Sequence, residues 1–212
     1  RMRGKGRRAS LRWMAAAALI PMLGTGLAVA PPAQAQFSQS YNFLKAVRDR
    51  DGQKVTDLVG KPGSTIVNAK DYNTGETALH IVTSGRDLQW MRFLLAKGAD
   101  PNARNRDGQT PLALAAMLGW VDGAQLLLAE GANVNATNDR GETPLIIAVQ
   151  RRDVPTVRLL LSNGADPNIS DHIAGMSARD YAKQDSRGAA ILRLIEEIKP
   201  VKRAPVQGPR MP

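Results

Sequence analysis

The sequence predicts an all-α fold, a solenoid in which pairs of helices stack as repeats and are joined by short β-hairpin-like loops. The stretch GADPN occurs at 98–102 and again at 164–168, and the near copy GANVN lies at 131–135, so the motif returns every 33 residues. Between the copies, apolar residues recur at helical intervals. A helix pair of this length cannot bury its apolar face alone, so neighbouring units must stack and share one core.

Residues 1–35 have the layout of an export signal. A basic start is followed by an Ala/Leu-rich run without charge, Trp13 to Ala30, and Ala33 to Ala35 supplies the small-x-small pattern that signal peptidase accepts. Proline and glycine interrupt the apolar run, which argues against a permanent membrane helix. We therefore expect cleavage before Gln36, with 36–40 as a short leader.

The export route stays open between two alternatives. RRASLR, at 7–12, resembles the twin-arginine export motif, but two adjacent arginines also occur in ordinary Sec-type secretory signals. Either route leads to a periplasmic or secreted protein. A retained signal segment would instead make the protein a membrane-anchored scaffold.

The excess of positive charge lies at the two ends of the chain. The formal net charge is +10, and it falls to +4 without the first 35 residues, which hold six basic and no acidic side chains. Residues 36–198 hold 19 basic and 19 acidic side chains. Because nucleic-acid binding needs a basic face on the domain itself, we expect none. The segment 199–212 has four prolines and no apolar periodicity, and it is predicted to be a disordered basic tail.

The first unit, about 41–71, and the last, about 172–198, have the apolar spacing of helix pairs but not the regular motifs. The first lacks a Thr-Pro start, and the last lacks the loop that follows other units. Terminal units of a repeat array meet water on one face and are expected to be atypical. We therefore expect two capping units around three clear ones at 72–105, 106–138 and 139–171.

The three central units share signals for helix starts and stops. A Thr followed by Pro places a hydroxyl acceptor at an N-cap and a residue without an N–H at the first helical position. The first helix of the middle unit breaks near Gly119, and Gly131 ends the second, because the C′ position favours a residue that accepts positive φ. The repeated structural positions are Thr77, His80, Gly98, Thr110, Pro111, Gly131, Thr143, Pro144 and Gly164.

These motifs resemble those of the ankyrin-repeat family. GQTPLALAA, LLLAEGANVNA and LLLSNGADPN follow the pattern G-x-T-P-L-H-x-A-A and L-L-x-x-G-A-D-x-N, and the resemblance covers about 41–198. It implies that His80 is buried and hydrogen-bonds between neighbouring hairpins. Relative to the central spacing, one extra residue enters the hairpin before Gly75 and another before Gly175, so these two loops are expected to project differently.

No set of residues in the chain forms a credible catalytic or metal site. The sequence has two histidines and no cysteine, so the fold is independent of disulfides and thiolate-bound zinc. The common metalloprotease, hydrolase and P-loop signatures are missing. The Asp and Asn residues of GADPN are isolated, unlike the dense oxygen ligands of a calcium loop, and both types bond their own backbone in turns. We therefore expect no enzyme activity, no cofactor and no metal.

The resemblance implies that function lies on hairpin tips and on the exposed, concave side of the first helices. The family's variable positions fall at Tyr72, Asn73, Ser84, Arg106, Asp107, Met117, Leu118, Asp139, Arg140, Gln150 and Arg151. With Trp120, Met117 and Leu118 would form an apolar patch flanked by charges, as binding surfaces often do. In the alternative interpretation, Leu118 and Trp120 pack against the next unit.

The prediction for function is a monomeric, non-catalytic module that binds another protein. A periplasmic module for a small ligand or a metal remains an alternative, and an enzyme would need a polar constellation that the sequence does not display.

Overall fold

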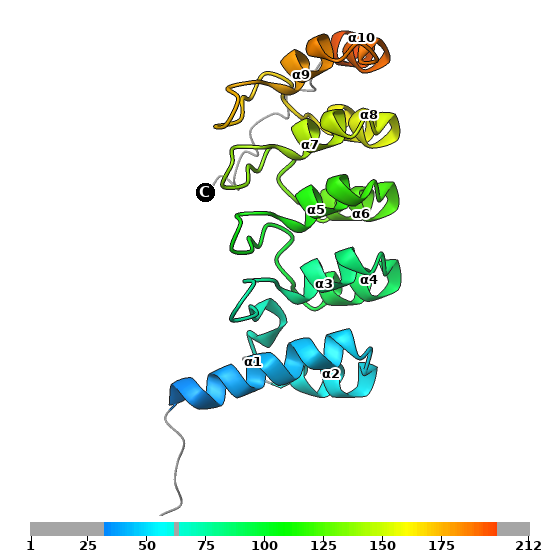
Figure 1. Ribbon diagram of the computed structural model, residues 1–212. Helices are drawn as coiled ribbons and strands as arrows, with labels where there is room; N and C mark the ends of the chain where they lie inside the picture. Colours follow the sequence, from blue (N-terminus) through cyan, green and yellow to red (C-terminus); the bar gives the residue numbers. More distant parts are fainter. Residues whose placement is uncertain (1–31, 62–63, 199–212) are drawn as a thin grey trace, which may run out of the picture. The chain divides into compact units, whose positions relative to one another are not determined.

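The computed structural model describes residues 32–61 and 64–198 (Figure 1). Of the predicted export signal, residues 1–31 lie outside the described residues, and so does the predicted tail, 199–212. Within the described ranges the secondary structure consists of ten α-helices and one 3-10 helix, with a single β-bridge between Ser170 and Ser177 and no strand. The predicted all-α class is confirmed.

The helices follow one another in pairs. Their bounds are α1 Pro32–Arg48, α2 Gly52–Val59, the 3-10 helix η1 Ile66–Asn68, α3 Ala78–Ser84, α4 Leu88–Ala96, α5 Pro111–Leu118, α6 Val121–Ala129, α7 Pro144–Gln150, α8 Val154–Ser162, α9 Ala178–Gln184 and α10 Ala189–Glu197. The odd-numbered members are the first helices of their pairs and the even-numbered ones the second helices.

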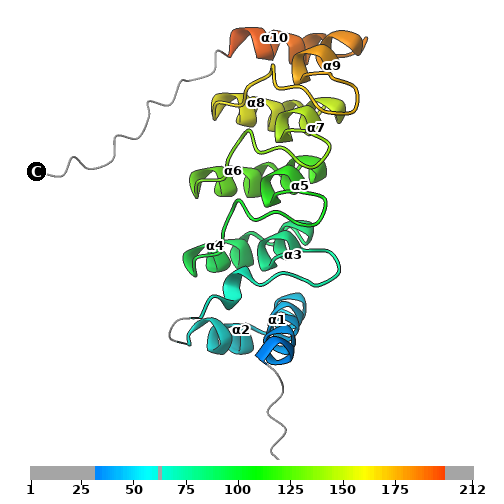
Figure 2. The ribbon, with the colours of Figure 1, turned by 90° about the vertical axis from the view of Figure 1, so that its left-hand side faces the viewer.

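The pairs stack in chain order as a solenoid. In both views the second helices α4, α6 and α8 lie on one side, the hairpin loops project on the other, and the first helices stand between them (Figures 1 and 2). We call the exposed side of the first helices α1, α3, α5 and α7, together with the hairpin tips, the first-helix face. It corresponds to the surface that the sequence analysis calls concave.

Side-chain caps start most of the helices. Thr110 and Thr143 accept hydrogen bonds from the backbone N–H groups three residues on, and proline occupies the first turn of α5 and α7. Asp87 and Asp153 cap α4 and α8 in the same way. Each cap satisfies an N–H that the helix itself cannot pair, and such caps contribute typically about 1 kcal/mol.

One continuous core joins all the pairs. Leucines at equivalent positions of successive units are fully buried, Leu79, Leu112 and Leu145 on first helices and Leu94, Leu127 and Leu160 on second helices. Burying each such side chain contributes roughly 1.5–3 kcal/mol, so the shared core is what holds the units together.

The first helix extends beyond the start of the unit predicted at about 41–71. Helix α1 starts at Pro32, well before Tyr41, so the leader predicted at 36–40 forms part of this helix. The predicted cleavage site after Ala35 falls in the first turn of α1. Whether the chain is cut there stays a prediction.

The turns between the two helices of the first four pairs each contain a residue in the left-handed conformation. Arg50, Arg86, Gly119 and Arg152 all have positive φ there. Arg50 reaches the next unit through an ion pair with Asp87 at 3.0 Å, and Arg152 does so through Asp185. The glycine interrupts this series of arginines in the middle unit.

Candidate functional site

The GADPN motif forms the joint between stacked units. Gly98, Gly131 and Gly164 have φ between 85° and 88° and follow α4, α6 and α8. After α4, the N–H of Gly98 bonds the carbonyl of Leu95 at 2.9 Å, and the N–H of Ala99 bonds that of Leu94 at 3.0 Å. This is a Schellman motif, and the bond pattern recurs after α6 and α8.

Asparagine side chains link each joint to the next. The amide of Asn102 donates to the carbonyl of Gly131 at 3.1 Å and accepts from the N–H of Asn133 at 2.7 Å. Asn68 and Asn135 make the same pair of bonds to the units that follow them. Asn168 closes the series by bonding Asp166 and Arg179 instead, because no further joint follows. These side chains are therefore engaged in scaffolding.

The hairpins connect along their tips. The N–H of Arg106 bonds the carbonyl of Thr74 at 2.9 Å, and the N–H of Asp139 bonds that of Asp107 at 3.0 Å. The first and last hairpins close between Asp71 and Glu76 and between Asp171 and Met176, one residue wider than the central ones. The extra residues predicted before Gly75 and Gly175 are thus confirmed.

His80 is fully buried between two units. Its Nδ1 lies 3.2 Å from the N–H of Thr77, which donates to it, and its Nε2 lies 2.9 Å from the carbonyl of Gln109 in the next hairpin. These bonds require the neutral ring with the proton on Nε2. Burial lowers the pKa of His80 below 6.5, against a smaller opposing effect of the bond to Gln109. These hydrogen bonds indicate that His80 has a structural role in joining two neighbouring units.

Most of the predicted partner residues lie exposed on the first-helix face. Tyr72 and Met117 are 71% and 38% exposed, and Leu118 is half-buried against the core. The other exposed members of the predicted set are Asn73, Ser84, Arg106, Asp107, Asp139, Arg140, Gln150 and Arg151.

Trp120 is the correction to that set. It is only 9% exposed and belongs to the core. Its ring lies directly over Gly123, where even a methyl group would collide with it. The indole therefore fills the space that a glycine leaves open, and the expected apolar patch is reduced to Met117 with the edge of Leu118.

Four of the predicted residues meet in one hollow. Asp107, Met117, Asp139 and Arg140 line a cavity of about 410 Å³ between the second and third hairpins and α5, which we call the central hollow. Its charges are partly paired, since Arg104 bonds Asp139 at 3.0 Å and Arg140 bonds Glu142 at 2.7 Å. Ser84, Gln150 and Arg151 do not line this hollow.

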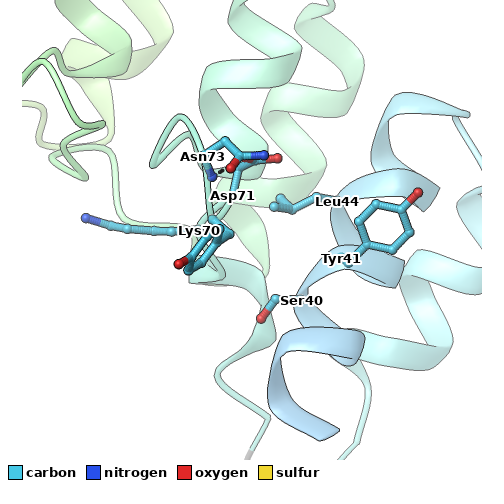
Figure 3. A pocket seen from close by; sticks show the side chains of 7 residues that line it. Ser40, Tyr41, Leu44, Lys70, Asp71 and Asn73 are labelled. Atoms are coloured by element: carbon cyan, nitrogen blue, oxygen red, sulfur yellow. Dashed lines mark hydrogen bonds between the residues drawn. The ribbon is translucent and has the colours of Figure 1, made fainter. Parts of the chain in front are cut away.

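A larger hollow lies where α1 meets the first hairpin (Figure 3). This α1 hollow has a volume of about 530 Å³ and brings Ser40, Tyr41 and Leu44 of α1 opposite the hairpin residues Lys70 to Asn73. Tyr72 and Asn73 belong to the surface predicted from the sequence, whereas Tyr41 and Lys70 were not predicted. The feature that could have indicated these two residues is a long first helix that begins before the repeat motif.

The large exposed apolar side chains gather on one side of the stack. Among the described residues they are Tyr41 on α1, Tyr72 and Ile173 on hairpin tips, and Met117 on α5, and none lies on a second helix. Ile173, at 77% exposed, is a further residue that the sequence analysis misses. Because exposed apolar groups that lie on one surface often mark an interaction site, their distribution points to the first-helix face as the surface of interest.

Neither a metal-binding cluster nor a membrane-spanning helix is found among the described residues. They contain no group of three or more His, Cys, Asp or Glu side chains placed to hold a metal ion. No helix in the same ranges has both the length and the apolar character needed to cross a membrane.

Comparison with protein families gives a direct match. The family described as "Ankyrin repeats (3 copies)" matches residues 43–138 and 91–171. Together the two matches run from 43 to 171, more than half of the chain, and they extend from the C-terminal part of α1 through α8.

Similar curated proteins share only the repeats. Oxysterol-binding protein homolog 1 of Saccharomyces cerevisiae is 33% identical over 85 residues, 39% of this chain and 7% of that protein. Oxysterol-binding protein-related protein 1 of Homo sapiens is 40% identical over 73 residues, 34% and 8% of the two chains. NF-kappa-B inhibitor zeta of Homo sapiens is 44% identical over 54 residues, 24% and 7%. The chain thus spans less than a tenth of the length of each of these three relatives.

Proposed function

The chain belongs to the ankyrin-repeat family, and we propose that it is a non-catalytic module, exported to the periplasm, that binds a partner protein through its first-helix face. Ankyrin repeats suggest protein–protein interaction in general, and the name of one relative, NF-kappa-B inhibitor zeta, describes a protein that acts on another protein. Assigning this family function to the chain rests on similarity of fold alone. The surface has to support it independently.

The observation that carries the proposal is the one-sided exposure of large apolar groups. Tyr41, Tyr72, Met117 and Ile173 lie on first helices or hairpin tips, and the hairpins also carry the ion pairs Arg104–Asp139 and Arg140–Glu142. Binding surfaces combine such apolar anchors with a polar rim. The opposite face presents exposed arginines such as Arg92 and Arg158 on α4 and α8, and this offers a matched control.

A capture experiment tests the proposal. The purified chain is used as bait in a periplasmic extract, with crosslinking and mass spectrometry of what is retained. The variant Met117→Glu/Arg151→Glu alters the first-helix face, and Arg92→Glu/Arg158→Glu places the same number of acidic groups on the opposite face. We expect the first variant to lose the partner and the second to keep it, with both retaining the helical circular dichroism of the wild type. Equal capture by all three proteins would refute binding through this face.

Export is tested separately. N-terminal sequencing of the protein from a periplasmic fraction is expected to begin at Gln36. A product that still carries the segment from Trp13 to Ala30 would favour the membrane-anchored alternative.

A further inference from the structure

We infer that the α1 hollow is the anchor subsite of the partner surface, and that it takes a bulky apolar side chain of the partner that is flanked by a carboxylate. The inference rests on the proposed function and specifies the chemistry of the partner segment.

The α1 hollow combines apolar and aromatic side chains with polar ones. Leu44, almost fully buried, points from α1 toward the hairpin, and Ser40 and Tyr41 lie on the same helix (Figure 3). Tyr41 on α1 and Tyr72 on the hairpin tip line the hollow from two different elements. Their side chains are 62% and 71% exposed. An aromatic or branched aliphatic side chain that enters the hollow would bury exposed surface of both tyrosines, which is how anchor residues of interfaces gain affinity.

The hollow is rigid on its hairpin side. The carboxylate of Asp71 accepts the N–H of Asn73 at 2.9 Å and that of Thr74 at 3.2 Å, which fixes the tip. Arg48 of α1 bonds the same carboxylate at 2.9 Å and ties the hairpin to the helix. A preformed cavity costs less ordering on binding than one that has to be assembled.

The charge that remains at the hollow is positive. Asp71 is neutralised by Arg48, and this pair holds the pKa of the Asp71 carboxyl below its usual value. Lys70 donates a single hydrogen bond, to the carbonyl of Arg104 at 2.8 Å, and keeps its other N–H groups for a ligand. The guanidinium of Arg106 lies 5.8 Å from the centre of the Tyr72 ring and adds a second cation to the hairpin rim. Glu76 of the same hairpin accepts a hydrogen bond from the hydroxyl of Thr74 at 3.3 Å and does not line the hollow, and Asp107 of the next hairpin lines the central hollow instead.

These charges select the occupant. A carboxylate next to the apolar side chain would lie against Lys70 and Arg106, whereas a basic segment would be repelled there. The chain's own residues 199–212 carry four basic and no acidic side chains. They are therefore disfavoured as the occupant, and a partner segment that combines an apolar residue with Asp or Glu is favoured.

Peptide selection tests this without knowledge of the natural partner. The full chain is panned against phage-displayed random dodecapeptides, and enriched sequences are synthesised and titrated by fluorescence anisotropy. Two variants alter the subsite, Tyr41→Ala/Tyr72→Ala and Lys70→Glu. Two controls lie on second helices, outside the first-helix face: Gln89→Ala/Gln125→Ala on α4 and α6, and Lys54→Glu on α2. Thermal unfolding of every variant verifies that the fold is intact.

We expect enriched peptides with an aromatic or branched aliphatic residue beside Asp or Glu. Each subsite variant should weaken their binding at least about tenfold, and each control should change it less than about twofold. Peptides without a carboxylate, or peptides that bind the Tyr41→Ala/Tyr72→Ala protein as well as the wild type, would overturn the inference.

Further arms separate this inference from the proposed function. A synthetic peptide of residues 199–212 that binds more tightly than the selected peptides, and loses affinity with Tyr41→Ala/Tyr72→Ala, would overturn the inferred acidic occupant. Selected peptides that are lost with Met117→Glu/Arg151→Glu but not with the subsite variants would overturn the subsite and leave the proposed function standing. Peptides insensitive to all of these changes would count against both.

Discussion

His80 makes the stability of the fold depend on pH. Because burial holds its pKa below 6.5 in the folded chain, the unfolded chain binds the proton more readily. The stabilisation is complete above the unfolded pKa and is lost as the pH falls through about 6.5 toward the folded value.

The first prediction follows from this sign. Between about pH 7.5 and about pH 5.5, the free energy of unfolding should fall by up to about 1.4 kcal/mol more in the wild type than in His80→Ala, measured by urea titration. The variant should also be less stable at pH 7.5, because it loses the bonds to Thr77 and Gln109. Asn102→Ala, which removes hydrogen bonds between units but no titratable group, is the control and should keep the wild-type pH dependence. An unaltered pH dependence in His80→Ala would contradict this role.

A second prediction at the residue scale concerns the asparagine series. Asn102 bonds two backbone groups of the next unit, whereas Asn168 has no following joint to bond. We expect Asn102→Ala to lower the free energy of unfolding by about 1–2 kcal/mol and Asn168→Ala to lower it by less. Equal losses in the two variants would show that the bonds between units add little.

At the scale of the element, the end of α6 depends on a glycine. Gly131 has φ 88°, and no neighbouring atom lies within 4 Å of an added Cβ. The side chain of an alanine would therefore fit, and the free-energy cost would come only from its left-handed backbone conformation. Gly131→Ala should therefore destabilise the protein by roughly 1–2 kcal/mol in thermal or urea unfolding.

Gly52 at the start of α2 supplies the control for that cost. It also has open space around an added Cβ, but its φ is not positive. Gly52→Ala should leave stability unchanged or raise it slightly. If both substitutions were harmless, the left-handed turn would not be what ends the helix.

The link between α7 and the last pair makes a further prediction. The bond from Arg152 lowers the pKa of Asp185 to about 2, so the pair stabilises the fold above the ordinary Asp pKa of 3.8 and is lost as the pH falls toward 2. The melting temperature of wild type and Arg152→Gln should therefore differ at neutral pH and converge as the solution is acidified toward pH 2. A difference in melting temperature that persists at pH 2 would show that Arg152 stabilises the fold through packing and not through its charge.

The elements themselves were predictable because their signals are local. The Thr-Pro starts of α5 and α7 and the glycine after α6 act within one turn of helix, and the structure places them at those ends. Helix α1 was placed too late because it starts outside the repeat motif. Its start at Pro32 has no Thr-Pro signal to mark it.

At the scale of the whole molecule, the surface was only partly predictable. The hairpin residues Asp107, Asp139 and Arg140 could be read from the repeat, and they meet in the central hollow. The burial of Trp120 depends on the missing side chain of Gly123 and could not be assigned from spacing alone. The α1 hollow likewise depends on how the long first helix faces the first hairpin, which no repeat register specifies.

Site-specific photocrosslinking tests the central claim most directly, that the first-helix face binds a partner while the second helices serve the stack. A photoreactive residue is placed at Met117 in one protein and at Arg158 of α8 in another, and each is irradiated in a periplasmic extract. The account predicts a discrete crosslinked partner from position 117 and none from position 158. Crosslinks of equal yield from both positions, or from position 158 alone, would contradict it.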